Sequence, residues 1–290
     1  MKQINRRNLL SIGGAGLAAS FLTPFAKANN NLLKACTSII PSETAGPYPA
    51  HSDDRGVNFL TQPGALRKKI ISSVGTNDYP GVATAKGIPL NVKLQIVDGT
   101  NGCAPLEGYV VYIWHCDETG LYSMYNTEVI EETYLRGVQL TDNNGYVEFE
   151  TVYPGCYDGR MVHMHFDVFK SIDLAVNNKT ITKTSQLTFP VEVSKAVYDK
   201  NSHIYTNGAE NLARISFETD NVFNDGYASQ LASIDSGNAI SGFTSSLQVV
   251  IDPTNIEQIG GGPGGPGGPN GPGGKPPGPP PQNKKNKKLS

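Results

Sequence analysis

The sequence lacks a long hydrophobic run beyond its first residues. After the apolar stretch 9–22, no segment approaches the roughly 20 consecutive apolar residues that a membrane-spanning helix needs. The net charge is also small, formally −2 from 24 basic and 26 acidic residues among 290. A strong excess of positive charge is the usual footprint of a nucleic-acid-binding protein. We therefore expect neither a membrane span nor a nucleic-acid partner.

Cysteines are few, and no two have Cys-x-x-Cys spacing. The four are Cys36, Cys103, Cys116 and Cys156. The absence of Cys-x-x-Cys spacing excludes the common zinc and thioredoxin-like motifs. In an oxidising compartment four cysteines allow two disulfides in three connectivities, and the sequence does not select one. We interpret Cys116 and Cys156 as structural, because soft thiolates do not suit a hard, oxygen-rich site.

No apolar helical periodicity is long enough for a major helix, and only residues 194–199 and 226–233 are weak helix candidates. Strand-like segments rich in β-branched and aromatic residues recur instead, at residues 90–97, 107–115, 146–151, 161–169, 180–189, 211–219 and 246–251. An Asn144-Gly145 turn predicts a hairpin between residues 138–140 and 146–149, with Val147 and Phe149 facing the core. The pattern predicts an all-β sandwich with few short helices.

The two ends of the chain differ from the middle. Residues 1–28 combine Arg6-Arg7, a short apolar stretch and a small-residue cleavage site, which predicts an export signal of the twin-arginine type. Residues 259–290 are mostly Gly and Pro with a basic end, typical of a disordered linker. We expect residues 29–258 to form one domain of an exported protein, periplasmic or extracellular. Assembly into an oligomer stays open.

Two histidines and two tyrosines are the candidate metal ligands. His163 and His165 lie two residues apart in a predicted strand, so both imidazoles point to one face while Val162, Met164, Phe166 and Val168 point to the other. Tyr122 and Tyr157 lie in predicted loops, from which their phenols can reach that strand. Imidazole binds iron, copper, zinc or nickel, and phenolate oxygen favours a trivalent ion. A single tyrosine or histidine in such a position is more often a packing or surface residue than a metal ligand. The hypothesis of a metal site therefore depends on the four residues together.

The order of several motifs resembles the intradiol ring-cleavage dioxygenases, particularly protocatechuate 3,4-dioxygenases. The matching segments are PSETAGPY at 41–48, IWHCDETGLYS at 113–123, LRG at 135–137, TDNNG at 141–145, PGCY at 154–157, RMVHMHF at 160–166 and SQLTF at 185–189. Each segment alone is weakly specific. Together they cover most of residues 36–190 in the order found in the family.

This resemblance implies a mononuclear non-haem Fe(III) centre bound by Tyr122, Tyr157, His163 and His165, with Tyr157 and His163 as the axial pair. It implies a catecholic substrate that displaces Tyr157 and reacts with O2 to give a muconate-type diacid. Arg160 and Gln186 correspond to active-site residues of the family. Gly46, Pro47 and Trp114 correspond to residues that line its pocket.

The sequence departs from the family in the link between Tyr157 and His163, which has only five residues. Well-studied members carry a longer insert there that helps to form the pocket. Met161-Val162 also replaces the usual Pro-Ala, and the helical dimerisation region of catechol 1,2-dioxygenases is missing. The short link motivates the hypothesis of an open cleft that accepts bulkier or substituted catechols.

Two other functions fit parts of the sequence. One is a non-catalytic exported β-sandwich that binds aromatic or carbohydrate molecules. A protein that only binds such molecules has no use for two tyrosines as metal ligands. The other is a divalent-iron oxygenase that uses His165, Asp167 and a distant histidine. Asp167 is a poor partner for both histidines, because on a strand it lies about 13 Å from His163.

Overall fold

A computed structural model of the chain describes residues 36, 38–51, 57–178 and 180–257. The predicted export signal at 1–28 and the predicted tail at 259–290 lie outside the described residues and stay predictions. The described residues form mostly β-strands in two sheets with a few short helices, as predicted. Within them, no helix is both long and apolar enough to cross a membrane.

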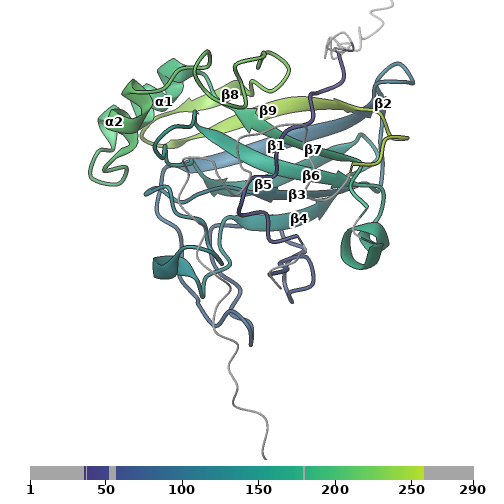
Figure 1. The fold of residues 1–290 in the computed structure, drawn as a ribbon, viewed down its shortest axis with the longest axis horizontal. Helices are drawn as coiled ribbons and strands as arrows, with labels where there is room; N and C mark the ends of the chain where they lie inside the picture. Colours follow the sequence, from purple (N-terminus) through teal and green to yellow (C-terminus); the bar gives the residue numbers. More distant parts are fainter. Residues whose placement is uncertain (1–35, 37, 52–56, 179, 258–290) are drawn as a thin grey trace, which may run out of the picture. The chain divides into compact units, whose positions relative to one another are not determined.

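The first sheet has five strands and contains the longest strands of the fold (Figure 1). β1 (Pro89–Asp98) pairs in parallel with β9 (Gly242–Ile251) and antiparallel with β5 (Tyr146–Val152) and the short β2 (Ala104–Pro105). β8 (Ser233–Asn238) pairs antiparallel with β9 at the edge.

The second sheet carries the candidate site. Its order is β4 (Arg136–Leu140), β3 (Val110–Trp114), β6 (His163–Phe169) and β7 (Lys183–Thr188), and all neighbours are antiparallel. All seven residues of β6 are buried, because both faces of this strand are covered. The register places Trp114 of β3 opposite His165 of β6.

The main core contains the inward side chains of both sheets. From β1 these are Leu90, Val92, Leu94 and Ile96, and from the second sheet they include Met164, Phe166 and Val168. The other face of the second sheet carries Trp114 and Tyr122 in a separate cluster with Phe59 and Val57 of the N-terminal segment. This division confirms the predicted alternation along β6, with the apolar side chains on one face and the histidines on the other.

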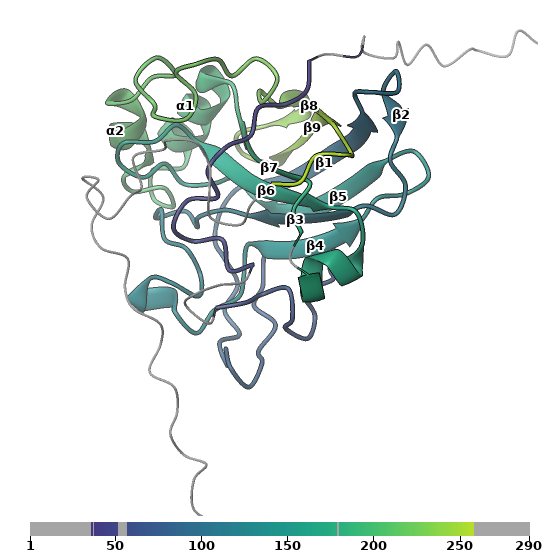
Figure 2. The same cartoon turned by 45° about the vertical axis from the view of Figure 1, so that its right-hand side comes forward.

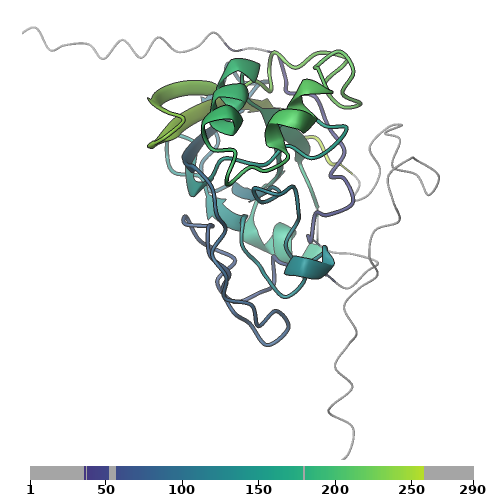
Figure 3. The same cartoon turned by 90° about the vertical axis from the view of Figure 1, so that its left-hand side faces the viewer.

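The helices are short and peripheral. α1 (Val191–Lys200) confirms the helix candidate at 194–199, and α2 (Gly208–Ala213) packs beside it at one end of the sheets (Figure 3). A 3-10 turn at Thr127–Val129 and a π-helical turn at Leu174–Asn178 are the remaining helical segments described.

Three local predictions were wrong. Residues 211–219 hold the end of α2 and turns rather than a strand, and 226–233 hold turns that lead into β8 rather than a helix. The turn at 142–145 forms, with Gly145 N donating to Asp142 O at 2.9 Å, but β4 and β5 enter different sheets. Turn residues specify a reversal of the chain, whereas the strand partner is decided by long-range packing. Val147 and Phe149 do face the core.

The cysteines form one disulfide among the described residues, not two. Cys36 bonds to Cys103 across 67 residues, while Cys116 and Cys156 are free and buried. The Cys116 thiol lies 3.5 Å from the Gly155 carbonyl oxygen, and the Cys156 thiol lies 3.5 Å from the Arg160 carbonyl oxygen. Both thiols are thus held by backbone acceptors, consistent with the structural role predicted for them.

Candidate metal centre

The four predicted ligands converge on one face of the second sheet. Tyr122 follows β3, Tyr157 lies in the loop between β5 and β6, and His163 and His165 lie on β6. The phenol oxygens of Tyr157 and Tyr122 lie 3.1 and 3.4 Å from Nε2 of His163. The two imidazole centroids are 4.8 Å apart. Side chains from three segments of the chain therefore share one small volume.

His163 has one nitrogen committed to the backbone and one free for the cluster. Its Nδ1 lies 2.6 Å from the carbonyl oxygen of Met161. A backbone acceptor on one ring nitrogen fixes the tautomer and the ring orientation, as is usual for metal-binding histidines. Nε2 is consequently presented to the two phenols.

His165 is held by packing. Trp114 stacks on it with ring centroids 5.0 Å apart and an interplanar angle of 7°. Nδ1 of His165 is buried without a hydrogen-bond partner among the described residues, and the stacked indole covers one face of the ring. On another side lies Gly46, with φ +68°, where an added Cβ would stand 3.5 Å from Cε1 of His165.

Burial keeps all four side chains neutral. It lowers the pKa of His163 and of His165 well below the usual range, and the positive charge of Arg160 adds to the effect. Burial also raises the pKa of Tyr157 to about 12 and that of Tyr122 well above its usual range. Neutral imidazole is the form that binds a metal, whereas the phenols must lose protons to a bound cation.

The donor set fits a trivalent ion. Nearest-neighbour ligands on an ion with bonds of about 2.1 Å lie roughly 3.0–3.4 Å apart, in tetrahedral or octahedral geometry. The oxygen-to-nitrogen distances at His163 fall in this range. In the described part of the chain, no group of three or more His, Cys, Asp or Glu side chains is arranged so that it could hold a metal ion.

The phenol oxygen of Tyr157 and Nε2 of His163 are neighbours at 3.1 Å. Which two of the four donors would stand opposite each other on a bound ion stays a prediction.

Arg160 and Gln186 adjoin the cluster and contact each other. Nη2 of Arg160 donates to Oε1 of Gln186 at 2.7 Å, and Nε2 of Gln186 donates to the Thr44 carbonyl at 2.9 Å. Nη1 of Arg160 lies 3.5 Å from Nε2 of His163. The structure thus brings both predicted catalytic residues to the site.

The three predicted pocket residues differ in position. Gly46 adjoins His165, and Pro47 next to it is exposed. Trp114 is fully buried behind His165, so it cannot touch a substrate without a rearrangement of the core. We correct its role from pocket lining to support of a ligand.

Two buried carboxylates near the site have partners that the sequence did not reveal. Asp220 accepts from Nε of Arg160 at 3.0 Å, although it lies 60 residues away in the sequence and within no recognisable motif. Asp167 pairs with His51 and accepts from Thr184 Oγ1 at 2.7 Å. The alternating pattern of β6 already placed Asp167 on the histidine face, but nothing in the sequence indicated its partners. Because both carboxylate oxygens are engaged, the structure does not favour the alternative metal site built on Asp167.

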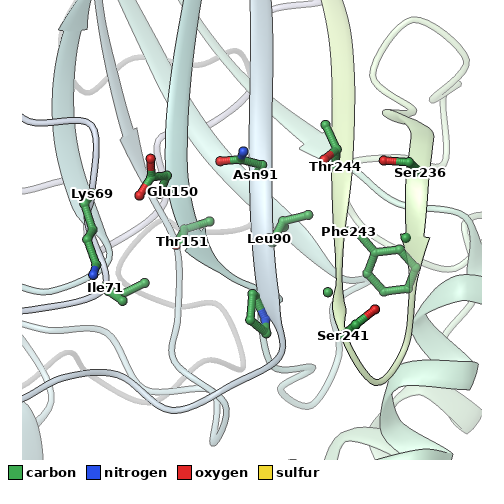
Figure 4. A pocket seen from close by; sticks show the side chains of 13 residues that line it. Lys69, Ile71, Leu90, Asn91, Glu150, Thr151, Ser236, Ser241, Phe243 and Thr244 are labelled. Atoms are coloured by element: carbon green, nitrogen blue, oxygen red, sulfur yellow. The ribbon is translucent and has the colours of Figure 1, made fainter.

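A separate groove of about 500 Å³ lies on the first sheet and is not lined by any of the four candidate ligands. Figure 4 shows its side chains, which come from β1, β5, β8, β9 and neighbouring loops and include both polar and apolar residues.

The chain is similar to several known proteins. Residues 74–180 match the family model described as "Dioxygenase". A segment of 90 residues is 38% identical to catechol 1,2-dioxygenase of Candida albicans, and the match spans 28% of this chain and 29% of that protein. An intradiol ring-cleavage dioxygenase structure from Tetranychus urticae aligns with a TM-score of 0.57 at 26% identity, covering 77% of this chain and 98% of that one. A second dioxygenase structure gives the same TM-score and coverage at 25% identity.

These matches show that the chain is similar to dioxygenases, over residues 74–180 for the family model and over 77% of the chain for the solved structures. The chain is a relative of the intradiol ring-cleavage dioxygenases. The family-model match includes the four candidate ligands, Arg160 and Trp114, and it ends before Gln186 and Asp220.

Proposed function

We propose that this protein is a mononuclear ferric dioxygenase that cleaves a catechol between its two hydroxyl-bearing carbons. The observation that carries the proposal is the convergence of two neutral imidazoles, one buried phenol and one half-buried phenol at distances typical of ligands on one ion. A ferric ion bound there would supply the Lewis acidity and the redox partner that a catecholate needs to react with O2.

Tyr157 is the residue suited to receive a substrate proton. Its environment raises the pKa of the free phenol to about 12, mainly through burial. A phenolate with so high a conjugate-acid pKa is a strong base once it leaves a cation. Tyr157 would thus serve first as a ligand and then as the acceptor of a catechol proton.

Arg160 would stabilise negative charge on the bound substrate. Its guanidinium points Nη1 toward His163, while Gln186 and Asp220 hold the other nitrogens. A donor fixed in advance costs no reorganisation when charge develops in the transition state. Gln186 acts through Arg160 in this arrangement and is a positioning residue.

We also propose that the site accepts substituted catechols. The link from Tyr157 to His163 is short, and an added Cβ at Gly159 would have no atom within 4 Å. The neighbouring Asp158 is exposed. Turnover of catechol, protocatechuate and a bulky aryl-substituted catechol tests this idea, and turnover of unsubstituted catechol alone contradicts it.

We propose that the protein is exported. The support is the predicted signal at 1–28 together with the Cys36–Cys103 disulfide, a bond that forms and persists in oxidising compartments. N-terminal sequencing of the mature protein from fractionated cells tests this, and an intact N-terminus in the cytosolic fraction contradicts it.

The main experiment combines metal analysis with product identification. Purified protein should bind about one iron per chain and consume one O2 per catechol, with both oxygen atoms in a ring-opened diacid. Tyr157→Phe should lose activity, whereas the matched control Tyr146→Phe, on β5 and away from the cluster, should not. Iron-loaded protein that binds catechols without consuming O2 would instead indicate a binding module.

A further inference from the structure

Arg160 is enclosed by a segment of the chain that the family-model match does not reach. Nε of Arg160 donates to Oδ2 of Asp220 at 3.0 Å, and its guanidinium carbon lies 5.8 Å from the centroid of the Phe223 ring. Asp220 has no exposed surface, and the Arg160 side chain is 13% exposed. This ion pair is therefore largely removed from solvent.

Asp220 is itself held by backbone amides. Its Oδ1 accepts from the amides of Val222 at 2.8 Å and Phe223 at 3.1 Å, and its Oδ2 also accepts from the amide of Met161 at 2.6 Å. The last bond joins residues 220–223 to the residue that follows Arg160. The carboxylate thus has four donors, and three of them are backbone groups that side-chain motion does not displace.

The direction of the guanidinium follows from these contacts. Asp220 holds Nε and Gln186 holds Nη2, so Nη1 is the nitrogen directed toward Nε2 of His163, at 3.5 Å. A guanidinium is planar, and two fixed nitrogens determine the position of the third. Without Asp220, one hydrogen bond to Gln186 would leave the side chain free to rotate.

We propose that Asp220 is a positioning residue that aims Arg160 into the reaction site. The proposal rests on the proposed function, because it assigns Arg160 the charge-stabilising role. It extends the functional unit beyond the matched region to the turn at 216–223. Loss of a residue that orients a metal-site group typically lowers activity by about 10- to 100-fold.

The test is a double-mutant cycle on kcat/KM with the full-length, iron-loaded protein. Asp220→Asn keeps the shape of the side chain and one acceptor oxygen but removes its negative charge. The group that faces Nε of Arg160 is then either an amide NH2, which cannot accept a hydrogen bond, or a neutral oxygen, which accepts a weaker one. The control is Asp252→Asn, because Asp252 caps its own turn in the same way, accepting from the Thr254 amide at 2.8 Å, and has no arginine partner among the described residues. Arg160→Ala and the double variant complete the cycle.

If Asp220 acts through Arg160, Asp220→Asn lowers kcat/KM by about 10-fold or more in the wild type and has no further effect in Arg160→Ala. Iron content and the Asp252→Asn control should be unchanged. Full activity in Asp220→Asn, or an equal loss in both backgrounds, overturns the proposal. If Asp220→Asn does not fold, Arg160→Lys tests the same bond, because lysine keeps the charge but cannot reach both Asp220 and Gln186. Full activity of Arg160→Lys overturns the proposal as well.

A wild type that cleaves no catechol would overturn the proposed function instead. The same four proteins then test the Asp220–Arg160 interaction through thermal unfolding. Non-additive shifts in Tm support the bond between the two residues, and additive shifts overturn the proposal together with the function.

Discussion

The indole of Trp114 lies parallel to the imidazole of His165, with ring centroids 5.0 Å apart. The two residues are direct partners in the register of β3 and β6, so the stack is part of the sheet. Figure 2 shows these two strands side by side, with the N-terminal segment passing over the second sheet. A candidate metal ligand is thus supported by the core of the protein.

Trp114→Ala should therefore affect both stability and metal binding. Removing a fully buried indole leaves a cavity and typically costs about 3–5 kcal/mol of unfolding free energy. It also frees the His165 ring, so the variant should hold less iron at a given free concentration. Denaturant unfolding and metal analysis measure the two effects. Trp114→Phe, which keeps an aromatic face, is the control, and equal iron binding in wild type and Trp114→Ala would contradict the supporting role.

The His51–Asp167 pair should contribute to stability without contributing to metal binding. Asp167→Ala leaves His51 and the hydroxyl of Thr184 without their buried partner. An unsatisfied buried polar group costs about 1–3 kcal/mol, so we expect a loss of roughly 2–4 kcal/mol in urea unfolding. Iron stoichiometry should be unchanged. Loss of iron in a folded Asp167→Ala variant would instead favour a carboxylate-ligated metal.

Titration with a thiol reagent should detect no reactive thiol in the native protein and two in the denatured, unreduced protein. Burial raises the pKa of Cys156 to about 12 and that of Cys116 well above its usual range, so neither should react with a thiol reagent in the native protein. Denatured, unreduced protein should release two reactive thiols, and reduction should release four. Closing a 67-residue loop gives an entropic stabilisation of about 4 kcal/mol, so Cys36→Ser should lower Tm markedly. Four reactive thiols without reduction would contradict the disulfide.

Glu43 should make stability depend on pH near neutrality. Burial raises its pKa from 4.5 to about 7, although the Gln230 hydrogen bond opposes this shift. Between these two pH values the folded protein keeps a proton that the unfolded chain has released, so stability falls as pH rises through this window. Glu43→Gln cannot ionise, and it should be more stable than wild type at pH 8 but not at pH 4. Parallel Tm-versus-pH curves for the two proteins would contradict this assignment.

The sequence predicted the local features of this fold better than the long-range ones. The alternation along β6 placed His163 and His165 on one face, because side-chain direction in a strand depends only on position. The strand that pairs with β5 could not be predicted in this way. The turn at 142–145 is compatible both with a hairpin of β4 and β5 and with the observed structure, in which the two strands enter different sheets. Residues 211–219 and 226–233 were misassigned because short polar segments depend on tertiary contacts for their structure, whereas α1 and β9 were predicted correctly.

The candidate site shows the same division. Tyr122, Tyr157, Arg160 and Gln186 were selected as candidates through motifs that lie close to them in the sequence, and the structure places them near one another. Asp220 and His51 were not, because each acts through a buried contact with a residue more than 50 positions away, and one polar residue in a loop carries no signal of its partner. Trp114 was assigned to the pocket because sequence position does not reveal which side of His165 it occupies.

The visible spectrum of the iron-loaded protein, recorded before and after anaerobic addition of catechol, tests the central claim most directly. Two tyrosinate ligands on ferric iron should give a red-brown protein through ligand-to-metal charge transfer, and catechol should shift the band by binding the same ion. Tyr157→Phe and Tyr122→Phe should each alter the spectrum, whereas Tyr146→Phe should not. A pure, ferric-iron-loaded protein without visible colour, or a spectrum indifferent to catechol, would contradict a tyrosinate-bound iron as the site of ring cleavage.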